Sequence, residues 1–444
     1  MSTETDRDAF RDKLRRLRRD GAPEREPEEG LPFWLRERLA RRRAQAGAVA
    51  RPPGPAPTSG APGELRVDAG AEGAVAWRET PLDGGHTHGG WRLCEVRDAE
   101  PATLSLLSGD PGLARVDLAR AVYLDTETSG LSGGAGVYVY LVGLGTFDGE
   151  RFRVWQGFLR DPAEERALLA EVARRLAQGA AIVSFFGKSF DRHRLEDKMR
   201  IAGVDSPFAG VPHLDLFAPC RRLTRGTLPD ARLRTLESTL CGLEREDDLP
   251  GAFAPEAWFD FLAGRPHRLE GVFRHNLDDV LSLVTLAAYV GRAAREERGD
   301  GRPLAGCART RARALARAHH AAGARAEALR WLEESIARGS ALGLESRELL
   351  FERADLLRRM RRDEEARRAL EDLLAGAPDS WSARCRIELA KLLEHRFGEL
   401  ERALELCEEA RRLVDARHAG RERARLLADL ARREPRLAKK LARG

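Results

Sequence analysis

Two carboxylates at the end of one apolar segment constrain this chain of 444 residues more than any other feature. The segment AVYLDTET is typical of a buried strand, and it contains Asp125 and Glu127 two residues apart. Because side chains of a strand alternate between its faces, both carboxylates point the same way. Like charges held together repel each other unless a cation lies between them. The pair therefore predicts a site for Mg²⁺ or Mn²⁺, which prefer oxygen ligands.

Two later segments offer further acidic ligands for this site. Asp191 lies in GKSFDRHRLED, after the apolar segment AAIVSFF. An alternative function for Asp191 is to cap the helix that begins at Arg192, since Asp is a favoured N-cap residue. The last segment, FRHNLDDVLSLVTLAAYV, has helical spacing and contains two adjacent acids, Asp278 and Asp279.

Helix geometry distinguishes these two acids. Asp279 shares a face with residues that we expect to be buried, namely Val272, His275, Leu283 and Leu286. Asp278 shares a face with residues that we expect to be exposed, namely Arg274, Ser282 and Thr285. A carboxylate on a buried face requires a partner, so Asp279 is the expected ligand. His275 lies one helical turn before it and is placed to accept a proton from an attacking water, although a hydrogen-bonded core histidine is the alternative.

The motifs together resemble the DnaQ-like 3′–5′ exonuclease superfamily, and most closely its YprB-like ribonuclease H-like branch. The resemblance covers roughly residues 64–295 and rests on the runs LDTETSGLSGGAGVYVYLVGLG, FRVWQGFLRDPAEE, GKSFDRHRLE, HLDLFAPCRRL, EREDDLPG and HNLDDVLSL. It implies an α/β domain of the ribonuclease H-like fold, with a mixed five-stranded sheet and helices on both faces. The order of the predicted elements, three strands followed by alternating helices and strands, agrees with that fold.

The resemblance also implies an activity. A nuclease of this superfamily would hold two divalent cations, Mg²⁺ or Mn²⁺, with Asp125, Glu127, Asp191 and Asp279, and would cleave nucleic acid, DNA or RNA, from its 3′ end. The alternatives are a structure-selective endonuclease and a scaffold with little or no activity. Backbone groups of Thr126, Thr128 and Gly130 would bind a terminal nucleotide, and Lys188 would bind a phosphate.

Two departures from the family pattern concern this site. His275 has the spacing to Asp279 that is usual for a tyrosine in the superfamily, which puts the identity of the general base in doubt. Phe186 stands where the YprB-like branch more often has asparagine, which would loosen the positioning of the substrate. Asp215 in HLDLF is expected to be a surface residue at a strand end, and the alternatives are a contact that supports the metal ligands or a contact to the substrate.

Composition divides the chain into three predicted parts. Residues 1–63 are basic and rich in proline and are expected to be disordered. Residues 64–300 form the catalytic domain, and residues 61–300 carry 29 basic and 37 acidic groups. Residues 301–444 carry 33 basic and 24 acidic groups and are predicted to be helical. Their positive charge is suited to nucleic acid, although a solvated helical surface explains it equally well.

Alanines recur at regular intervals in the third part. Three follow each other every 36 residues, and three more follow at 38 and 37, namely Ala318, Ala354 and Ala390, and Ala328, Ala366 and Ala403. This spacing resembles tetratricopeptide (TPR) repeats and predicts a surface for nucleic acid or a protein partner, with an unclassified helical bundle as the alternative. No segment is long and apolar enough to span a membrane, and six cysteines without CxxC spacing fit a reducing cytoplasm.

Overall fold

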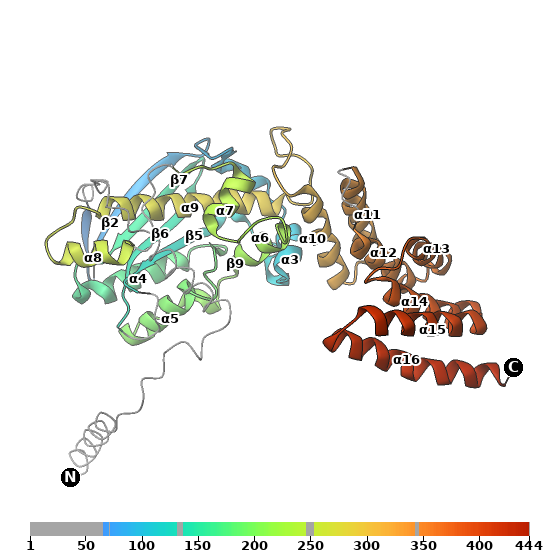
Figure 1. Ribbon diagram of the computed structural model, residues 1–444. Coiled ribbons are helices and arrows are strands. Elements are labelled where there is room, and N and C mark those ends of the chain that lie inside the picture. Colours follow the sequence, from blue (N-terminus) through green and yellow to red (C-terminus); the bar gives the residue numbers. More distant parts are fainter. Residues whose placement is uncertain (1–64, 71, 131–135, 246–252, 342–345, 444) are drawn as a thin grey trace, which may run out of the picture. The chain divides into compact units, whose positions relative to one another are not determined.

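The structure is a computed structural model, and it describes residues 65–70, 72–130, 136–245, 253–341 and 346–443 (Figure 1). The segment 1–63, which is predicted to be disordered, lies outside these residues. Most of the acidic run EREDDLPG also lies outside them. No helix of the described residues is long and apolar enough to cross a membrane.

A seven-stranded mixed sheet forms the centre of the first part, in the order β1-β2-β7-β6-β5-β8-β9. Its strands are β1 (Arg66–Gly70), β2 (Gly73–Asp83), β5 (Val122–Thr128), β6 (Val139–Asp148), β7 (Arg151–Phe158), β8 (Ile182–Ser184) and β9 (His213–Asp215). β5 pairs in parallel with β8, and β8 with β9, whereas the remaining pairs are antiparallel. The mixed sheet is confirmed, but β1 and β2 add two strands to the expected five. β2 pairs along the whole of β7 and covers an edge that would otherwise be unpaired.

Helices cover both faces of this sheet (Figure 1). They are α3 (Pro101–Ser108), α4 (Glu165–Leu176), α5 (Asp191–Ala202), α6 (Phe217–Leu223), α7 (Leu233–Leu236), α8 (Ala254–Leu262) and α9 (Leu269–Gly291). Alternation along β5 divides the core between the faces. Val122 and Leu124 pack in one apolar cluster with α4, α5 and α8, whereas Tyr123 packs in another with α3, α6 and most of α9. Asp125 and Glu127 therefore lie on the Tyr123 side.

Two glycines allow α9 to lie close against the sheet. A Cβ atom on Gly143 would lie 2.3 Å from Asn276 Oδ1, and one on Gly145 would lie 2.7 Å from Val280 Cγ1. Gly143 is also the register partner of Asp125 across β5 and β6. The run VGLG thus brings α9 over the strand end that carries the acidic pair.

The second part is built from consecutive antiparallel helices. They are α10 (Ala308–Ala321), α11 (Arg325–Ala341), α12 (Arg347–Arg359), α13 (Asp363–Leu374), α14 (Ser382–Leu392), α15 (Leu400–Arg417) and α16 (Gly420–Leu441). The recurring alanines lie where neighbouring helices meet. Ala354, Ala366, Ala390 and Ala403 are all fully buried. α10 also contacts α3 and α6, and one apolar cluster extends from the sheet into α10–α14. The apolar core is therefore continuous across residue 300.

A buried carboxylate joins the last helix to this stack. Glu394 lies in the π-helical turn Leu393–Phe397, and its side chain is completely buried. Three cations of α16 surround it: Arg433 at 2.8 Å, Arg436 at 2.7 Å and Lys440 at 2.8 Å. Burial alone would raise the pKa of Glu394, but hydrogen bonds from Arg436 and Lys440 outweigh it and lower the pKa to about 2.

We expect Glu394→Gln to lower the free energy of unfolding by roughly 2–3 kcal/mol, because the variant leaves Arg433 buried without this partner while the two exposed cations contribute little. A carboxylate with a lowered pKa stabilises the fold fully above its ordinary value of 4.5, and this contribution is lost as the pH falls towards 2. Urea unfolding followed by circular dichroism at pH 7 and pH 3 checks both effects. Glu371→Gln, which affects an exposed ion pair with Arg367, is the control.

Candidate active site

The first two carboxylates lie at the end of β5, which runs between β6 and β8. Asp125 and Glu127 are partly exposed, whereas their neighbours Thr126 and Thr128 are buried. This alternation places the two acids on one face, as expected. Asn276 of α9 donates a hydrogen bond to Asp125 Oδ2 at 2.7 Å, so this carboxylate faces α9.

The third carboxylate begins α5. Asp191 is the first helical residue, and Phe190 rather than Asp191 is in the N-cap position. Asp191 is only 7% exposed, and its carboxylate accepts a hydrogen bond from Thr126 Oγ1. Burial raises the pKa of Asp191 to about 6, the hydrogen bond from Thr126 opposes this rise, and the charges of Asp215 and Asp279 add to it. The capping alternative is therefore wrong, and Asp191 is turned towards β5.

The fourth carboxylate comes from α9. Asp279 Oδ2 lies 3.7 Å from His275 Nε2, one turn earlier. Asp279 Oδ1 lies 2.6 Å from Arg245 Nη2. The expected burial pattern of α9 is only partly correct, because Ser282 and Thr285 are buried and not exposed. They are buried because α9 packs against the sheet on one side and against the turn Glu237–Cys241 on another.

The four carboxylates act on one another electrostatically. Burial raises the pKa of Asp125 well above its ordinary value, and the charges of Asp279, Glu127 and Asp191 raise it further. A cation would relieve this repulsion. All of these donors are oxygens, a set that fits Mg²⁺ or Mn²⁺ rather than a softer metal.

In the described residues, no three His, Cys, Asp or Glu side chains are arranged as a formed metal site. Asp279 is instead paired with Arg245. The chemistry of the donor set fits a divalent cation, and Asp279 would have to exchange its guanidinium partner to take part.

Arg245 is a site residue that the sequence motifs did not indicate. Its side chain is 4% exposed and lies 2.6 Å from the fully buried Glu237. Ser282 Oγ donates to Glu237 at 2.6 Å, and His88 Nε2 lies 2.9 Å from Ser282 Oγ. The run EREDDLPG carries part of the family resemblance, but none of its residues was predicted to belong to the site. Its arginine faces the carboxylates because buried Glu237 and Asp279 need a cationic partner.

A second network positions Asp125. Asn276, which is fully buried, donates to Asp125 and accepts a hydrogen bond from Gln156 Nε2 at 2.8 Å. Gln156 in turn accepts from Arg78 Nε at 2.9 Å, and Arg78 forms an ion pair with Glu270 at 2.8 Å. The network connects β2, β7 and α9, so only the assembled sheet creates it.

The residues expected to bind substrate have the following surroundings. Thr126 donates its hydroxyl hydrogen bond to Asp191, and Thr128 Oγ1 donates to Gly130 O at 3.0 Å. Lys188 Nζ lies 3.4 Å from Asp110 Oδ2, and its side chain is 39% exposed. Their binding functions stay predictions.

Asp215 has a structural function in the turns beside the site. It accepts hydrogen bonds from the backbone nitrogens of Phe186, Lys188 and Phe217, at 2.8, 3.0 and 3.0 Å. A plain surface position does not describe this residue, because its carboxylate ties together two turns, one of which packs against Asp191. A contact to the substrate stays a prediction.

We expect Arg245→Gln to lower the free energy of unfolding by about 3–5 kcal/mol, because it leaves the buried Glu237 carboxylate without its cation. Chemical denaturation of the full chain measures this loss. Arg174→Gln is the matched control: Arg174 is 53% exposed, lies 2.6 Å from Glu171, and should contribute at most about 1 kcal/mol. Equal effects of the two substitutions would contradict the structural importance of the Glu237–Arg245 pair.

Comparison with known proteins supports the resemblance. Residues 122–290 match the RNase_H superfamily. Over 352 residues the chain is 29% identical to the uncharacterized protein YprB of Bacillus subtilis (strain 168), covering 75% of this chain and 78% of YprB. Two crystal structures of a Podosopora anserina protein with nearly identical TPR-like repeats, one of them of a variant, cover 56% of this chain and 95% of theirs. Their identities are 18% and 17%, and the TM-score of 0.23 is too low to support an argument.

The expected fold is therefore confirmed. The chain contains a ribonuclease H superfamily domain, is similar to YprB, and continues into a helical region.

Proposed function

We propose that the ribonuclease H superfamily domain of this chain hydrolyses phosphodiester bonds of nucleic acid with the help of two divalent cations, Mg²⁺ or Mn²⁺. One observation carries this proposal. Asp125 and Glu127 of β5, Asp191 of α5 and Asp279 of α9 come together from distant parts of the sequence, and three of them raise the pKa of the fourth. Such mutual repulsion is costly unless the site serves to bind positive charge.

The residues of the chain would divide the work as follows. The cations would supply Lewis acidity and charge stabilisation in the transition state. Asp125, Glu127, Asp191 and Asp279 would hold them, and the amide of Asn276 would keep Asp125 in its orientation. His275, whose Nε2 atom lies 3.7 Å from Asp279 Oδ2, would accept the proton of the attacking water.

The polarity that we propose, 3′ to 5′, comes from the superfamily resemblance. The alternatives are a structure-selective endonuclease and a scaffold without activity, and one cleavage experiment distinguishes all three. Linear and circular single-stranded DNA and RNA, the linear ones labelled at the 5′ end, are incubated with the protein and Mg²⁺ or Mn²⁺. We expect progressive shortening of the linear substrates and intact circles. Cut circles would show an endonuclease, and no cleavage of any substrate would support the scaffold.

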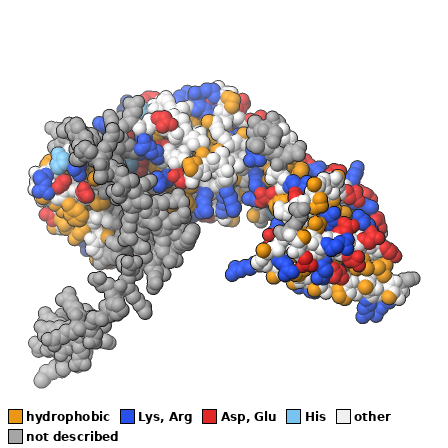
Figure 2. Space-filling view, viewed as in Figure 1, with side chains coloured by type: hydrophobic (Ala, Val, Ile, Leu, Met, Phe, Trp, Pro, Cys, Tyr) orange, Lys and Arg blue, Asp and Glu red, His pale blue; other side chains and the backbone are white. Residues whose placement is uncertain are grey.

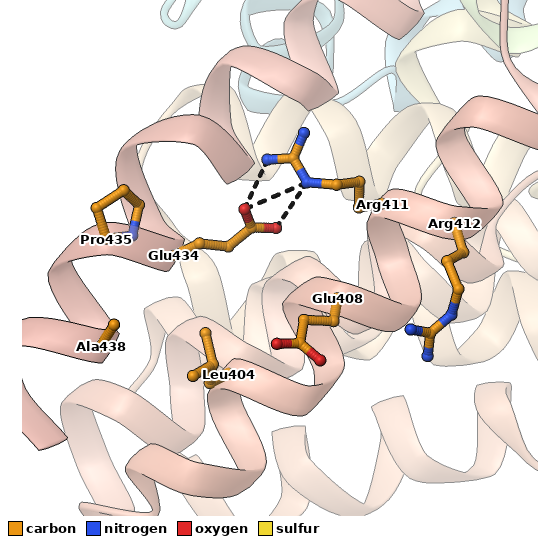
Figure 3. A pocket seen from close by; sticks show the side chains of 7 residues that line it. All are labelled: Leu404, Glu408, Arg411, Arg412, Glu434, Pro435 and Ala438. Atoms are coloured by element: carbon orange, nitrogen blue, oxygen red, sulfur yellow. Dashed lines mark hydrogen bonds and ion pairs between the residues drawn. The ribbon is translucent and has the colours of Figure 1, made fainter.

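The helical region is proposed to work as a TPR-like platform for nucleic acid or a protein partner. In Figure 2 its Lys and Arg side chains are interspersed with Asp and Glu. Many of these are paired, as Arg313 is with Glu348 and Arg386 with Glu409. A hollow between α15 and α16 presents the apolar side chains Leu404, Pro435 and Ala438 beside charged ones, among them the Arg411–Glu434 pair (Figure 3). Because this surface carries both charges, the helices suit a protein partner at least as well as a polyanion. A cytoplasmic location, which the six unpaired cysteines fit, stays part of the proposal.

The domain boundary near residue 300 is also a proposal. We expect residues 64–300 alone to cleave a short oligonucleotide at saturating concentration, since all the proposed catalytic residues lie within them. Binding of longer substrates should weaken and depend less on salt if arginines beyond the boundary contact phosphates. Dissociation constants measured at several salt concentrations check this. An unchanged salt slope would assign the helices to a protein partner. If circular dichroism shows that residues 64–300 alone are unfolded, the boundary lies elsewhere, since α10 packs on α3 and α6.

A further inference from the structure

The backbone at Phe186 is unusual. Its φ is 62°, in the left-handed region that bulky side chains rarely adopt. Across the described ranges only Cys307 and Arg361 share this feature among non-glycine residues. Those two lie at helix ends, Cys307 at the N-cap of α10 and Arg361 directly after the C-cap of α12. Phe186 instead lies in the turn between β8 and α5, beside the proposed catalytic site.

The carboxylate of Asp215 holds this turn. Its Oδ1 atom accepts hydrogen bonds from Phe186 N at 2.8 Å and from Phe217 N at 3.0 Å. Its Oδ2 atom accepts one from Lys188 N at 3.0 Å. One side chain therefore fixes both the strained turn and the beginning of α6. A sparsely populated backbone conformation that is fixed so thoroughly by its surroundings is typical of a functional position.

The consequence of this arrangement is a group of aromatic rings. The ring of Phe186 contacts that of Phe217 edge to face, with centroids 4.9 Å apart and an interplanar angle of 72°. Phe185 contacts Phe217 from 5.7 Å. All three side chains are partly exposed. Asp215 thus holds these rings where part of their apolar surface contacts solvent, so that this part adds little to the stability of the fold.

The turn that carries Phe186 packs against one of the proposed catalytic carboxylates, Asp191. A Cβ atom on Gly187 would lie 3.2 Å from Asp191 Oδ2, so the turn packs against that carboxylate. The amide of Arg192 donates to Gly187 O at 2.9 Å and joins the turn to α5. Lys188, whose side chain is 39% exposed, supplies a positive charge in the same turn. An aromatic face and a cation beside acidic residues suit a single strand of nucleic acid.

We propose that Phe186 and Phe217 form a stacking subsite for an unpaired nucleobase next to the scissile phosphate. The inference rests on the proposed function and adds a substrate class to it, namely nucleic acid with a single-stranded end. A base inside a duplex already has both faces covered by its neighbours and cannot stack on a side chain. Stacking on an aromatic residue is sequence-tolerant, so we expect little preference among the four bases.

A cycle of protein and base substitutions tests this subsite. The full-length chain carries Asp125→Asn to prevent cleavage and is compared with the same chain carrying Phe186→Tyr or Phe186→Asn in addition. Dissociation constants are measured in Mg²⁺ for a short single strand and for versions with an abasic residue at each of the last three 3′ positions. Asn tolerates left-handed backbone, so Phe186→Asn should fold, and its thermal midpoint is measured as a check.

We expect an abasic residue at one position to weaken binding to the Asp125→Asn protein by about 10-fold. The Phe186→Tyr variant should show the same loss, whereas the Phe186→Asn variant should bind both strands equally. An equal abasic penalty in all three proteins would overturn the stacking subsite and leave the proposed function intact, since the strand would still bind. No binding of any strand to these proteins, together with no cleavage by the wild type, would overturn both.

Discussion

Replacing Asp125 or Asp279 by asparagine is expected to lower the rate of nucleic-acid cleavage by about 10³-fold or more, since several kcal/mol of transition-state stabilisation would depend on the cations they hold. Both substitutions preserve shape. Neither should unfold the protein, because removing one negative charge relieves the repulsion that raises the pKa of Asp125, and Arg245 keeps Glu237 as a partner when Asp279 is replaced. Rates on a labelled oligonucleotide and thermal midpoints measured without cations separate the two effects.

Asp278→Asn is the matched control for this prediction, because Asp278 is the adjacent acid on the same helix. Asp279 contacts both Arg245 and His275, and its charge raises the pKa of Asp125 and of Asp191. We therefore expect Asp278→Asn to keep most of the activity. Equal losses in the Asp278 and Asp279 variants would contradict the assignment of Asp279 as the ligand.

His275→Ala is expected to reduce turnover by about 10²-fold or more, as is typical for the loss of a general base. The affinity for Mn²⁺ should change much less, since the imidazole is not among the proposed ligands. His267→Ala serves as the control, because His267 precedes the same helix and its side chain is 53% exposed. Turnover at saturating substrate reports on the proton transfer, and calorimetric titration of Mn²⁺ reports on cation binding, so the two measurements separate these effects.

Unchanged turnover in the His275 variant would show that the histidine is a core residue and that another group accepts the proton. Reduced turnover together with equally reduced Mn²⁺ affinity would instead make His275 part of the cation site. The spacing of His275 and Asp279, which is unusual for the superfamily, makes this measurement informative in either case.

The parts of the fold that could be predicted from the sequence depend on local patterns. Strand alternation predicts Asp125 and Glu127 on one face, and the structure has both partly exposed while Thr126 and Thr128 between and beside them are buried. Helical spacing predicted that His275 and Asp279 lie side by side, and His275 Nε2 is indeed 3.7 Å from Asp279 Oδ2. The expected exposure of Ser282 and Thr285 was wrong, because a helix packed on two sides has no wide solvent face.

The parts that could not be predicted depend on contacts between residues distant in sequence. Arg245 and Asp279 are distant in sequence but form an ion pair in the structure. Glu237 also pairs with Arg245, and no local sequence pattern predicts the turn in which Glu237 lies. Asn276 reaches Asp125 only because Gly143 leaves room for α9 on the sheet. The one signal in the sequence was a single arginine within the acidic run EREDDLPG, and its direction cannot be read from the sequence. Such contacts follow from tertiary packing, which a single sequence does not specify.

Calorimetric titration of Mn²⁺ into the full-length protein at neutral pH tests the central claim most directly, because the account requires the carboxylate cluster to be a cation site. It predicts binding to the wild type, much weaker binding to the Asp125→Asn and Asp279→Asn variants, and wild-type binding to Asp278→Asn. Absence of binding to the wild type, or equal binding to all four proteins, would contradict a cation site formed by Asp125, Glu127, Asp191 and Asp279.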